Sequence, residues 1–327
     1  MFKIKSVIAL TAASVLLLAG CASNSNPANK AFEGITPTCE HFKGGPEIDQ
    51  VKVTATEGKV PTVTFPTKAD GTSELAKITA AQTKVIKEGS GPMFTGNQLV
   101  TIEYVVLNSA TGVVLANSKF DGSDAASQLF GSTSTKIFCD DLTGVREGSL
   151  VAFANPHFEQ EVNGTLYVLL LKRIYLPHAN GEVQGLPSGL PSVVRDPKTG
   201  QPGLVKPNFS APKELQKAVL IKGRGEIVTA GDSVTVHYVG WVWGSEISST
   251  PFDSSWDSGN GPATFTLKTG PGGVIKGFVD GIVGETVGSQ IIVSIPPADG
   301  YGEQGNGSSI PANSTLLFVI DILGINK

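Results

Sequence analysis

The chain has 327 residues, room for two domains of ordinary size, and a formal net charge of −4 at pH 7. No patch rich in Lys and Arg accompanies that acidic balance, so we expect no nucleic acid among its partners. The sequence also lacks a Gly-x-Ser-x-Gly elbow and a phosphate-binding glycine loop, and its four histidines are scattered. We therefore expect neither a bound metal nor any other cofactor.

The chain starts with a segment typical of exported proteins. Lysines precede an apolar run from Val7 to Leu18, which is too short to span a bilayer and has the length of a signal-peptide core. The run ends Leu18-Ala19-Gly20-Cys21, which resembles the bacterial lipobox, and that resemblance implies cleavage before Cys21 and acylation of its thiol. The alternative is an ordinary signal peptide followed by a chance cysteine.

We accordingly predict a signal peptide over residues 1–20 and a lipidated, flexible tether over residues 21–46, which are rich in Ser, Asn, Pro and Gly. Acyl chains on Cys21 would insert into a lipid bilayer, so the predicted location is extracytoplasmic, lipid-anchored to the bacterial cell membrane. Cys39 and Cys139 are the other cysteines, in a compartment that favours disulfides. The sequence leaves open whether they pair or stay unpaired, with one of them buried on a helix.

Beyond the tether the chain can be aligned with itself. Val100-Thr101-Ile102-Glu103-Tyr104 matches Val234-Thr235-Val236-His237-Tyr238 without a gap, and later segments match in the same order. We predict two copies of one unit, over residues 47–176 and 213–327. A Pro- and Gly-rich linker over residues 177–212 would join them as an extended connection.

The second copy shows two periodicities. From Val234 to Tyr238, and again from Leu316 to Ile322, apolar residues alternate with others, as in strands that bury one face. Between them, apolar residues from Ile275 to Val283 recur at the spacing of one short amphipathic helix. We therefore predict an α+β fold of two units, each a bent antiparallel β-sheet wrapped around one short α-helix. Leu190–Val194 also echoes Val60–Thr64, which predicts a short leading strand for each unit.

Separated blocks of the second copy resemble a known family. They are Phe252-Asp253-Ser254-Ser255, Val274-Ile275, Asp299-Gly300-Tyr301-Gly302, Ile310-Pro311 and the strand that contains Phe318. These blocks have the order and approximate spacing of FKBP-type peptidyl-prolyl cis/trans isomerases. The run from about Lys213 to Lys327 resembles that family, and the whole chain resembles a bacterial tandem-FKBP lipoprotein.

The resemblance implies an apolar pocket and assigns its residues. The catalytic residues would be Tyr238, Phe252, Asp253, Ile275, Tyr301 and Phe318, and the substrate-binding residues would be Val274, Phe278 and Ile310. The rings would form the walls and floor, and Asp253 would be the carboxylate of the pocket. The Tyr301 hydroxyl and the Ile275 N–H would bind the substrate, and Ile310 would close the other side.

Two departures from the family bear on the width of the pocket. Tryptophan is frequent in the family where Phe278 stands, and an aromatic residue is frequent where Ala263 stands, so a wider pocket is expected here. The alternative for each aromatic residue is core packing, which we adopt for Phe265. Phe252 beside Asp253 in a turn favours the pocket instead.

We predict a peptidyl-prolyl cis/trans isomerase that accelerates the folding of exported proteins at the membrane surface, with proline-containing unfolded or exported polypeptides as partners. Such a pocket needs no nucleophile, because moving an Xaa–Pro bond out of water disfavours the planar amide more than the twisted transition state. The alternative function is a non-catalytic chaperone or surface peptide-binding adaptor. We expect a monomer.

The first copy has the same strand pattern as the second, but it lacks several of the residues assigned to the pocket. Leu115-Ala116 stand where the second copy has Phe252-Asp253, and Ser134-Thr135 stand where it has Val274-Ile275. The segment from Tyr301 to Pro311 has no counterpart. We therefore expect no isomerase activity from this degenerate copy. Its expected role is to space and stabilise, with peptide binding as the alternative.

Overall fold

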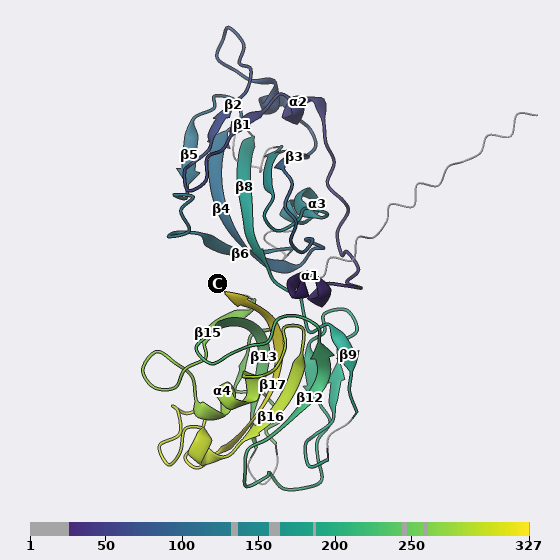
Figure 1. Cartoon of the computed structure of the whole chain (residues 1–327), viewed down its shortest axis with the longest axis vertical. Helices are drawn as coiled ribbons and strands as arrows, with labels where there is room; N and C mark the ends of the chain where they lie inside the picture. The colour runs from purple at the N-terminus through teal and green to yellow at the C-terminus, as the bar shows by residue number, and fades with distance from the viewer. Residues whose placement is uncertain are drawn as a thin grey trace, which may run out of the picture.

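The computed structural model describes residues 26–131, 137–156, 164–185, 188–243, 247–257 and 261–326. The predicted signal peptide and Cys21 lie outside these ranges. Two antiparallel β-sheets dominate the chain, one before and one after residue 176, and they lie end to end in Figure 1. Each sheet carries one short helix, so the described part is α+β and rich in sheet. None of its helices is long and apolar enough to cross a membrane.

The N-terminal unit, residues 46–176, is built on a sheet ordered β3-β7-β8-β4-β5, with β6 also paired to β4. Its strands are β3 (Gln82–Lys87), β4 (Gln98–Asn108), β5 (Val114–Asn117), β6 (Ala126–Phe130), β7 (Leu150–Asn155) and β8 (Thr165–Ile174). The helix α3 (Ile137–Leu142) packs on one face. Ahead of the sheet come α2 (Pro46–Asp49), the hairpin of β1 (Lys52–Thr54) and β2 (Thr62–Thr64), and the 3-10 helix η1 (Glu74–Lys77).

The C-terminal unit, residues 177–326, is built on a sheet ordered β14-β13-β17-β16-β12-β9, with β15 also paired to β13. Its strands are β9 (Gly181–Val183), β12 (Gln216–Gly223), β13 (Ser233–Trp243), β14 (Asp253–Ser254), β15 (Ala263–Thr266), β16 (Gln290–Ile295) and β17 (Thr315–Asn326). The helix α4 (Lys276–Ile282) packs on one face, and the 3-10 helix η2 (Pro297–Asp299) follows β16. A hairpin of β10 (Val193–Arg195) and β11 (Pro202–Leu204) precedes β12.

The central strands of the two sheets pair in the same register. Equivalent pairs are Tyr104–Leu169 and Tyr238–Ile320, and then Val106–Tyr167 and Gly240–Phe318. In both sheets the tyrosine N–H donates to a serine hydroxyl at 2.9 Å, from Tyr104 to Ser118 and from Tyr238 to Ser255. The irregularity between Thr101 and Ile102 also has its counterpart between Thr235 and Val236. The repeat found in the sequence is therefore present in the strand pairing.

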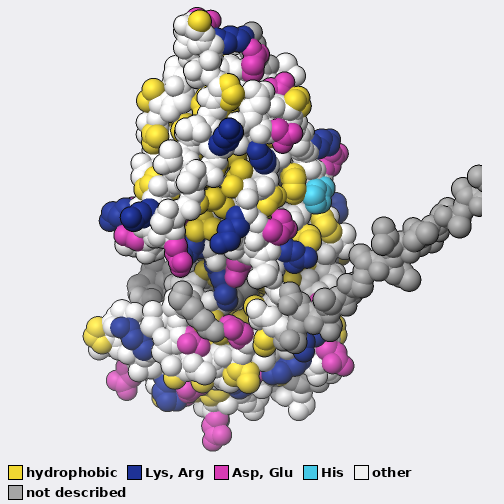
Figure 2. Space-filling model, turned by 45° about the horizontal axis from the view of Figure 1, so that its top comes forward, with side chains coloured by type: hydrophobic (Ala, Val, Ile, Leu, Met, Phe, Trp, Pro, Cys, Tyr) yellow, Lys and Arg dark blue, Asp and Glu magenta, His cyan; other side chains and the backbone are white. Residues whose placement is uncertain are grey.

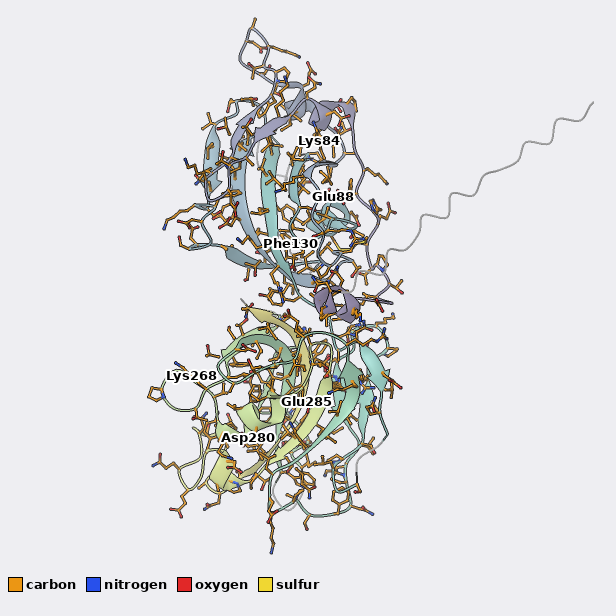
Figure 3. All side chains as sticks on the ribbon, viewed as in Figure 1. Lys84, Glu88, Phe130, Lys268, Asp280 and Glu285 are labelled. Carbon is orange, nitrogen blue, oxygen red and sulfur yellow. A yellow bond between two sulfur atoms is a disulfide. The ribbon has the colours of Figure 1, made fainter. Side chains whose placement is uncertain are left out.

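Each sheet buries apolar side chains on both faces. One face packs against the helix of its unit, α3 or α4. The other face is covered by the segment that precedes the sheet, which contributes Ile48, Val51 and Leu75 in the N-terminal unit. In the C-terminal unit the same role falls to Leu190, with Val193 and Leu204 packed alongside. The leading strands predicted from the sequence therefore lie in the segments that cover the sheets, and Figure 3 shows side chains filling both units.

Residues 177–212 are more than the linker that the sequence predicted. β9 pairs with β12 and so forms the edge of the C-terminal sheet. The Ala179 N–H donates to the buried Asp321 carboxylate at 2.7 Å, and Leu190 is 6% exposed. The prolines allow this because they occur at strand ends and between the short strands, where their missing N–H groups are tolerated.

The segment from residue 26 to 46 also differs from the expected flexible tether. It begins with the helix α1 (Pro27–Ala31), which lies between the two sheets in Figure 1. Ala31 is fully buried in the core under α4, and the Asn180 amide donates to the Ala31 carbonyl at 2.7 Å. On its other side, the Asn29 amide donates to the Ser90 carbonyl of the N-terminal unit. Burial of one small apolar residue and these hydrogen bonds order a segment whose composition alone indicates flexibility.

A disulfide joins Cys39 to Cys139, the pairing that the sequence left open. Their Cα atoms are 5.9 Å apart, a usual separation for a disulfide, and the two residues are 100 positions apart in the chain. Cys139 lies on α3 and is fully buried. The bond therefore fastens the N-terminal segment to the helix of the N-terminal unit.

Candidate functional site

A cavity of about 550 Å³ opens on the helix side of the C-terminal sheet. Its lining comes from β13, β14, β15, β17, α4 and the loops around α4 and η2. The lining residues are Tyr238, Phe252, Asp253, Phe265, Thr269, Gly270, Gly273, Val274, Ile275, Lys276, Phe278, Tyr301 and Phe318. The cavity thus brings together every residue that the sequence assigned to the pocket except Ile310.

Four aromatic rings meet at the base of this cavity in edge-to-face and tilted arrangements. Phe318 is central: its ring centroid lies 5.5 Å from that of Phe278 and 5.6 Å from that of Phe252, with interplanar angles of 83° and 89°. The ring centroid of Tyr238 lies 6.3 Å from the ring centroids of both Phe278 and Phe318. Such contacts place the positive edge of one ring on the negative face of the next, which fixes their orientations. The result is a rigid, apolar floor.

Gly240 makes room for one of these rings. It sits on β13 opposite Phe318, and a Cβ atom there would approach Phe252 to 2.6 Å and Phe318 to 2.8 Å. Any side chain at Gly240 would therefore displace the rings. The sequence assignment missed this residue, although an isolated glycine inside a regular strand is itself a signal of a close approach.

Asp253 and Tyr238 form the polar part of the cavity wall. The Tyr238 hydroxyl donates to the Asp253 carboxylate at 2.5 Å. Burial and this hydrogen bond raise the pKa of Tyr238 above its usual value, so the hydroxyl stays protonated and keeps donating at neutral pH. Asp253 is exposed on its other side. The pair thus fixes the orientation of the Tyr238 ring.

The rim of the cavity is set by the start of α4. Ile275 is the N-cap, with φ −62° and ψ 149°, and the Val274 N–H donates to the Lys268 carbonyl at 2.9 Å. That bond folds the preceding loop toward the cavity. Within the described ranges no group accepts a hydrogen bond from the Ile275 N–H. This amide at the rim therefore has the capacity to donate to a ligand carbonyl.

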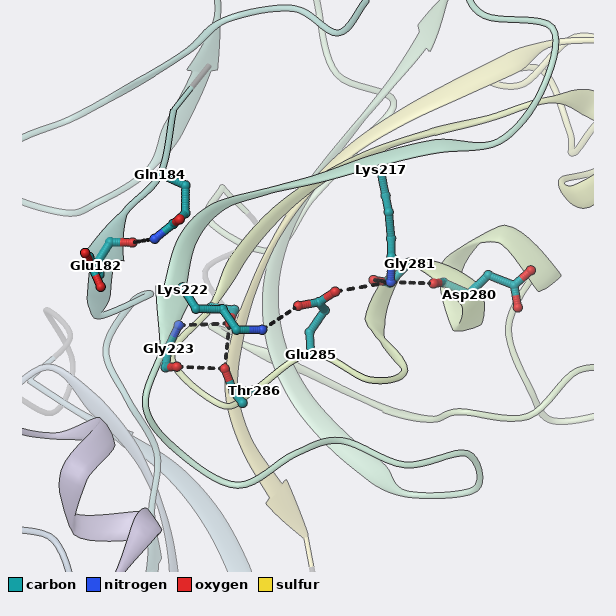
Figure 4. A network of polar contacts seen from close by, with 10 residues as sticks. Glu182, Gln184, Lys217, Lys222, Gly223, Asp280, Gly281, Glu285 and Thr286 are labelled. Carbon is teal, nitrogen blue, oxygen red and sulfur yellow. Dashed lines mark hydrogen bonds and ion pairs between the residues drawn. The ribbon is translucent and has the colours of Figure 1, made fainter. Parts of the chain in front are cut away.

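The other end of α4 is held by charged groups on β12, as Figure 4 shows. The Lys217 ammonium donates to the Asp280 and Gly281 carbonyls at 3.1 and 3.3 Å, which places positive charge at the helix C-terminus. Glu285, which is 8% exposed, bridges Lys217 and Lys222 at 3.2 and 3.1 Å. This network fixes the helix whose first turn lines the cavity.

The loop after η2 contributes Tyr301 and closes on itself. Tyr301 is 36% exposed at the cavity. The Asn306 N–H donates to the Ile310 carbonyl at 2.8 Å, and the Gly305 N–H donates to the Tyr301 carbonyl at 3.2 Å. Ile310 is placed differently from the expectation that it closes the pocket, because it is 4% exposed and packs in the core beneath. Its role in the structure is to anchor the loop that carries Tyr301.

The tertiary structure also shows where Phe265 and His237 lie relative to the cavity. Phe265, which we had assigned to the core, lines the cavity, with its ring 5.4 Å from that of Phe278 and 5.7 Å from that of Tyr238. Strand β15 turns its partly buried face to the pocket, which the sequence pattern did not reveal. His237 lies on the other face of β13, away from the cavity, with its ring centroid 3.9 Å from that of Trp256 and a hydrogen bond to the Ser255 hydroxyl.

Part of this chain is similar to known proteins. The family model for the FKBP-type peptidyl-prolyl cis-trans isomerase covers residues 225–323, which include every lining residue of the cavity. FK506-binding protein 1 of Aspergillus oryzae is 35% identical over 117 residues, 34% of this chain and 98% of that protein. The FK506-binding protein of Neisseria meningitidis serogroup A is 40% identical over 106 residues, 32% of this chain and 91% of that protein. The crystal structure of FkpA from Escherichia coli is similar over 36% of this chain and 51% of that chain, with 33% identity and a TM-score of 0.31.

Proposed function

Because the chain belongs to the FKBP-type peptidyl-prolyl cis-trans isomerase family, we propose that its C-terminal cavity catalyses cis/trans isomerisation of Xaa–Pro bonds in exported polypeptides. The observation that carries this proposal is the meeting of four aromatic rings with one phenol–carboxylate pair in a single cavity.

The chemistry fits a cavity of this kind. Rotation about an Xaa–Pro bond is slow because resonance stabilises the planar amide, with a barrier of about 18–20 kcal/mol. The twisted transition state has lost that resonance and its charge separation. An apolar floor of Phe252, Phe278 and Phe318 therefore destabilises the planar amide relative to the twisted one. Catalysis follows from this difference in binding.

The polar groups then hold the chain on either side of the rotating bond. The Ile275 N–H at the rim and the Tyr301 hydroxyl on its loop would each donate to a substrate carbonyl. Asp253 would keep the Tyr238 ring against the substrate proline through their hydrogen bond. Val274 and Phe278 would contact the proline ring and the residue before it. With the flanking chain fixed, rotation is confined to the single bond in the cavity.

The proposal also covers the location of the protein, the role of its N-terminal unit and its substrates. The lipobox resemblance supports acylation at Cys21 and a location at the outer surface of the bacterial cell membrane. The equal strand registers of the two sheets support the interpretation of the N-terminal unit as a second, degenerate FKBP-like unit. Leu115 and Ala116 replace Phe252 and Asp253 there, so that unit would have no isomerase activity. The substrates would then be unfolded proteins that have just crossed the membrane.

The direct test is an isomerisation assay on the full mature chain with an unstructured Xaa–Pro peptide. Phe318→Ala removes the central ring of the floor, admits water and should cause the largest loss of rate. Phe209→Ala, on a residue that packs against Trp243 outside the cavity, is the matched control and should retain the parent rate. A folded Phe318→Ala protein with the parent rate would contradict the assignment, as would a wild-type chain without activity.

Membrane attachment needs its own measurement. Cys21→Ser should yield a protein that no longer partitions with membranes and whose N-terminal mass lacks the acyl groups. An equally membrane-bound Cys21→Ser protein of unaltered N-terminal mass would show that the anchor lies elsewhere.

A further inference from the structure

The N-terminal unit has a cavity of its own. It measures about 320 Å³ and lies between α3 and the concave face formed by β4, β6, β7 and β8. Its principal walls are Tyr104, Phe138, Phe153 and Tyr167, with Ala126 and Val106 at the sides. In Figure 2, hydrophobic side chains gather in the middle of the N-terminal unit, with charged side chains around them. We call the space between α3 and these four strands the N-terminal cavity.

The N-terminal cavity occupies the same place in its sheet as the candidate active site does in the other. The strand registers make Tyr104 the counterpart of Tyr238 and Tyr167 the counterpart of Phe318. The aligned helices make Phe138 the counterpart of Phe278. Three positions of the aromatic floor are thus aromatic in both units.

Its rings pack directly against one another, as those of the C-terminal cavity do. Phe153 and Tyr167 stack with centroids 4.7 Å apart and an interplanar angle of 12°. The ring of Phe138 packs edge-on against both, with centroid separations of 5.5 Å to Phe153 and 5.3 Å to Tyr167. When a rigid, preformed aromatic wall binds an apolar group, its side chains lose little conformational entropy.

The polar groups differ in a way that removes the catalytic features. Ala116 stands opposite Val106, where the C-terminal sheet has Asp253 opposite Gly240. Within the described ranges, therefore, no carboxylate lines the N-terminal cavity, and the Tyr104 hydroxyl donates to no protein group there. The Tyr104 hydroxyl is left to donate to a bound molecule.

An exposed apolar edge strand runs beside this cavity. β5 is at the edge of the sheet, next to β4, which lines the cavity. Its Val114 and Leu115, with the preceding Val113, are 51%, 55% and 58% exposed. An edge strand offers unpaired backbone groups to another extended chain. The volume is at the lower end for ligand pockets, which suits one or two side chains rather than a large cofactor.

We propose that the N-terminal cavity binds an aliphatic or aromatic side chain of an extended, unfolded polypeptide, whose backbone lies along β5. The cavity takes the apolar side chain, the Tyr104 hydroxyl donates to a backbone carbonyl, and the apolar edge strand contacts the rest of the segment. Because the carboxylate and the ring of the Phe252 position are missing, the N-terminal unit holds the chain and does not turn over prolyl bonds. This binding is separate from the proposed isomerase activity and does not depend on it.

The test uses the full mature chain and a fluorescein-labelled, proline-free peptide of about twelve residues in which Leu and Phe alternate with Ser. Omitting proline keeps the assay separate from prolyl turnover. Ala126→Trp fills the cavity from β6 without removing a core side chain. Ser127→Trp places the same ring on the other face of the same strand, where Ser127 is exposed, and serves as the matched control. Fluorescence anisotropy measures both affinities.

We expect saturable binding by the wild-type chain, a loss of affinity of tenfold or more in Ala126→Trp, and a change of less than twofold in Ser127→Trp. Equal affinities in Ala126→Trp and wild type would overturn the proposal, as would no binding by the wild-type chain. Loss of binding in Gly240→Val would also overturn it, because the peptide would then occupy the C-terminal cavity.

A second measurement needs no variant and so does not depend on the folding of Ala126→Trp. In methyl NMR spectra of the wild-type chain, the peptide should shift the resonances of Val106 and Leu169, which line the N-terminal cavity. The resonances of Val274 and Ile275 at the C-terminal cavity should stay in place. The reverse pattern would place the peptide in the C-terminal cavity and contradict the proposal.

Discussion

Gly240 lies directly beneath the ring of Phe252, and a Cβ atom at Gly240 would approach Phe252 Cζ to 2.6 Å. Glycine weakens a central strand, so its presence in β13 calls for a reason, and the reason is the ring above it. In the N-terminal sheet the equivalent position is Val106, and Leu115, the counterpart of Phe252, is 55% exposed. The absence of a side chain on one strand therefore permits a ring to enter the cavity from the next.

The first prediction follows from this contact. Gly240→Val should push the Phe252 ring off Phe318, open the apolar floor to water and lower kcat/KM of prolyl isomerisation at least tenfold. The fold should persist because valine is favourable in strands. Gly203→Val, at a glycine of β11 whose added Cβ would meet only Val194 at 3.5 Å, is the matched control. An unchanged rate in a folded Gly240→Val protein would show that Phe252 is not part of the catalytic wall.

A second prediction concerns the polar groups of the cavity. Asp253→Leu or Tyr301→Phe removes one polar contact worth about 1–3 kcal/mol, so each should lower kcat/KM tenfold to a hundredfold, less than Phe318→Ala. Tyr238→Phe in the Asp253→Leu background should cost little more, since their hydrogen bond is already lost. Steady-state assays of the single and double variants measure this coupling, and strictly additive losses would contradict it.

The third prediction is a pH dependence of stability. Burial lowers the pKa of His237 to about 3 from an ordinary value of 6.5, with the neighbouring His178 adding to the shift. The unfolded chain therefore binds a proton at this residue between pH 6.5 and 3 while the folded chain does not. Stability should be fully present above pH 6.5 and fall toward pH 3, by about 1.4 kcal/mol per pH unit for one proton.

Denaturant unfolding of the wild type and of His237→Gln over this pH range checks the assignment. Glutamine does not titrate, so the variant should show a smaller loss of stability on acidification. The isomerase rate at pH 7 should be preserved, because His237 lies on the face of β13 away from the cavity. Identical pH slopes in the two proteins would rule His237 out as the titrating group.

The fourth prediction has the opposite sign. Burial raises the pKa of Asp141 on α3 to about 7 from 3.8, so the folded state retains a proton that the unfolded state has released. The contribution of this group to stability is present below pH 3.8 and is lost as the pH rises through 7. Asp141→Asn should therefore raise Tm at pH 8 and have a smaller effect at pH 4. Thermal unfolding at both pH values tests it, with exposed Asp49→Asn as the control that should behave alike at both.

Much of the site could be predicted because its elements are local in the sequence. The spacing of Ile275, Phe278 and Ile282 indicated a helix, and the alternation from Val234 to Tyr238 indicated a strand with one buried face. The match between the two copies also placed Leu115-Ala116 where the strand registers now place them. Both kinds of pattern can be recognised in the sequence itself, so they could be identified without knowledge of the fold.

The tertiary structure alone decided which distant segments meet. It paired Cys39 with Cys139, buried Ala31 of a supposedly flexible segment between the two units, and added β9 to the C-terminal sheet. It also turned Phe265 into the cavity and buried Ile310 beneath the loop that carries Tyr301. These outcomes depend on which apolar surfaces remain uncovered once the sheets have formed. That is a property of long-range packing, and no local pattern of residues contains it.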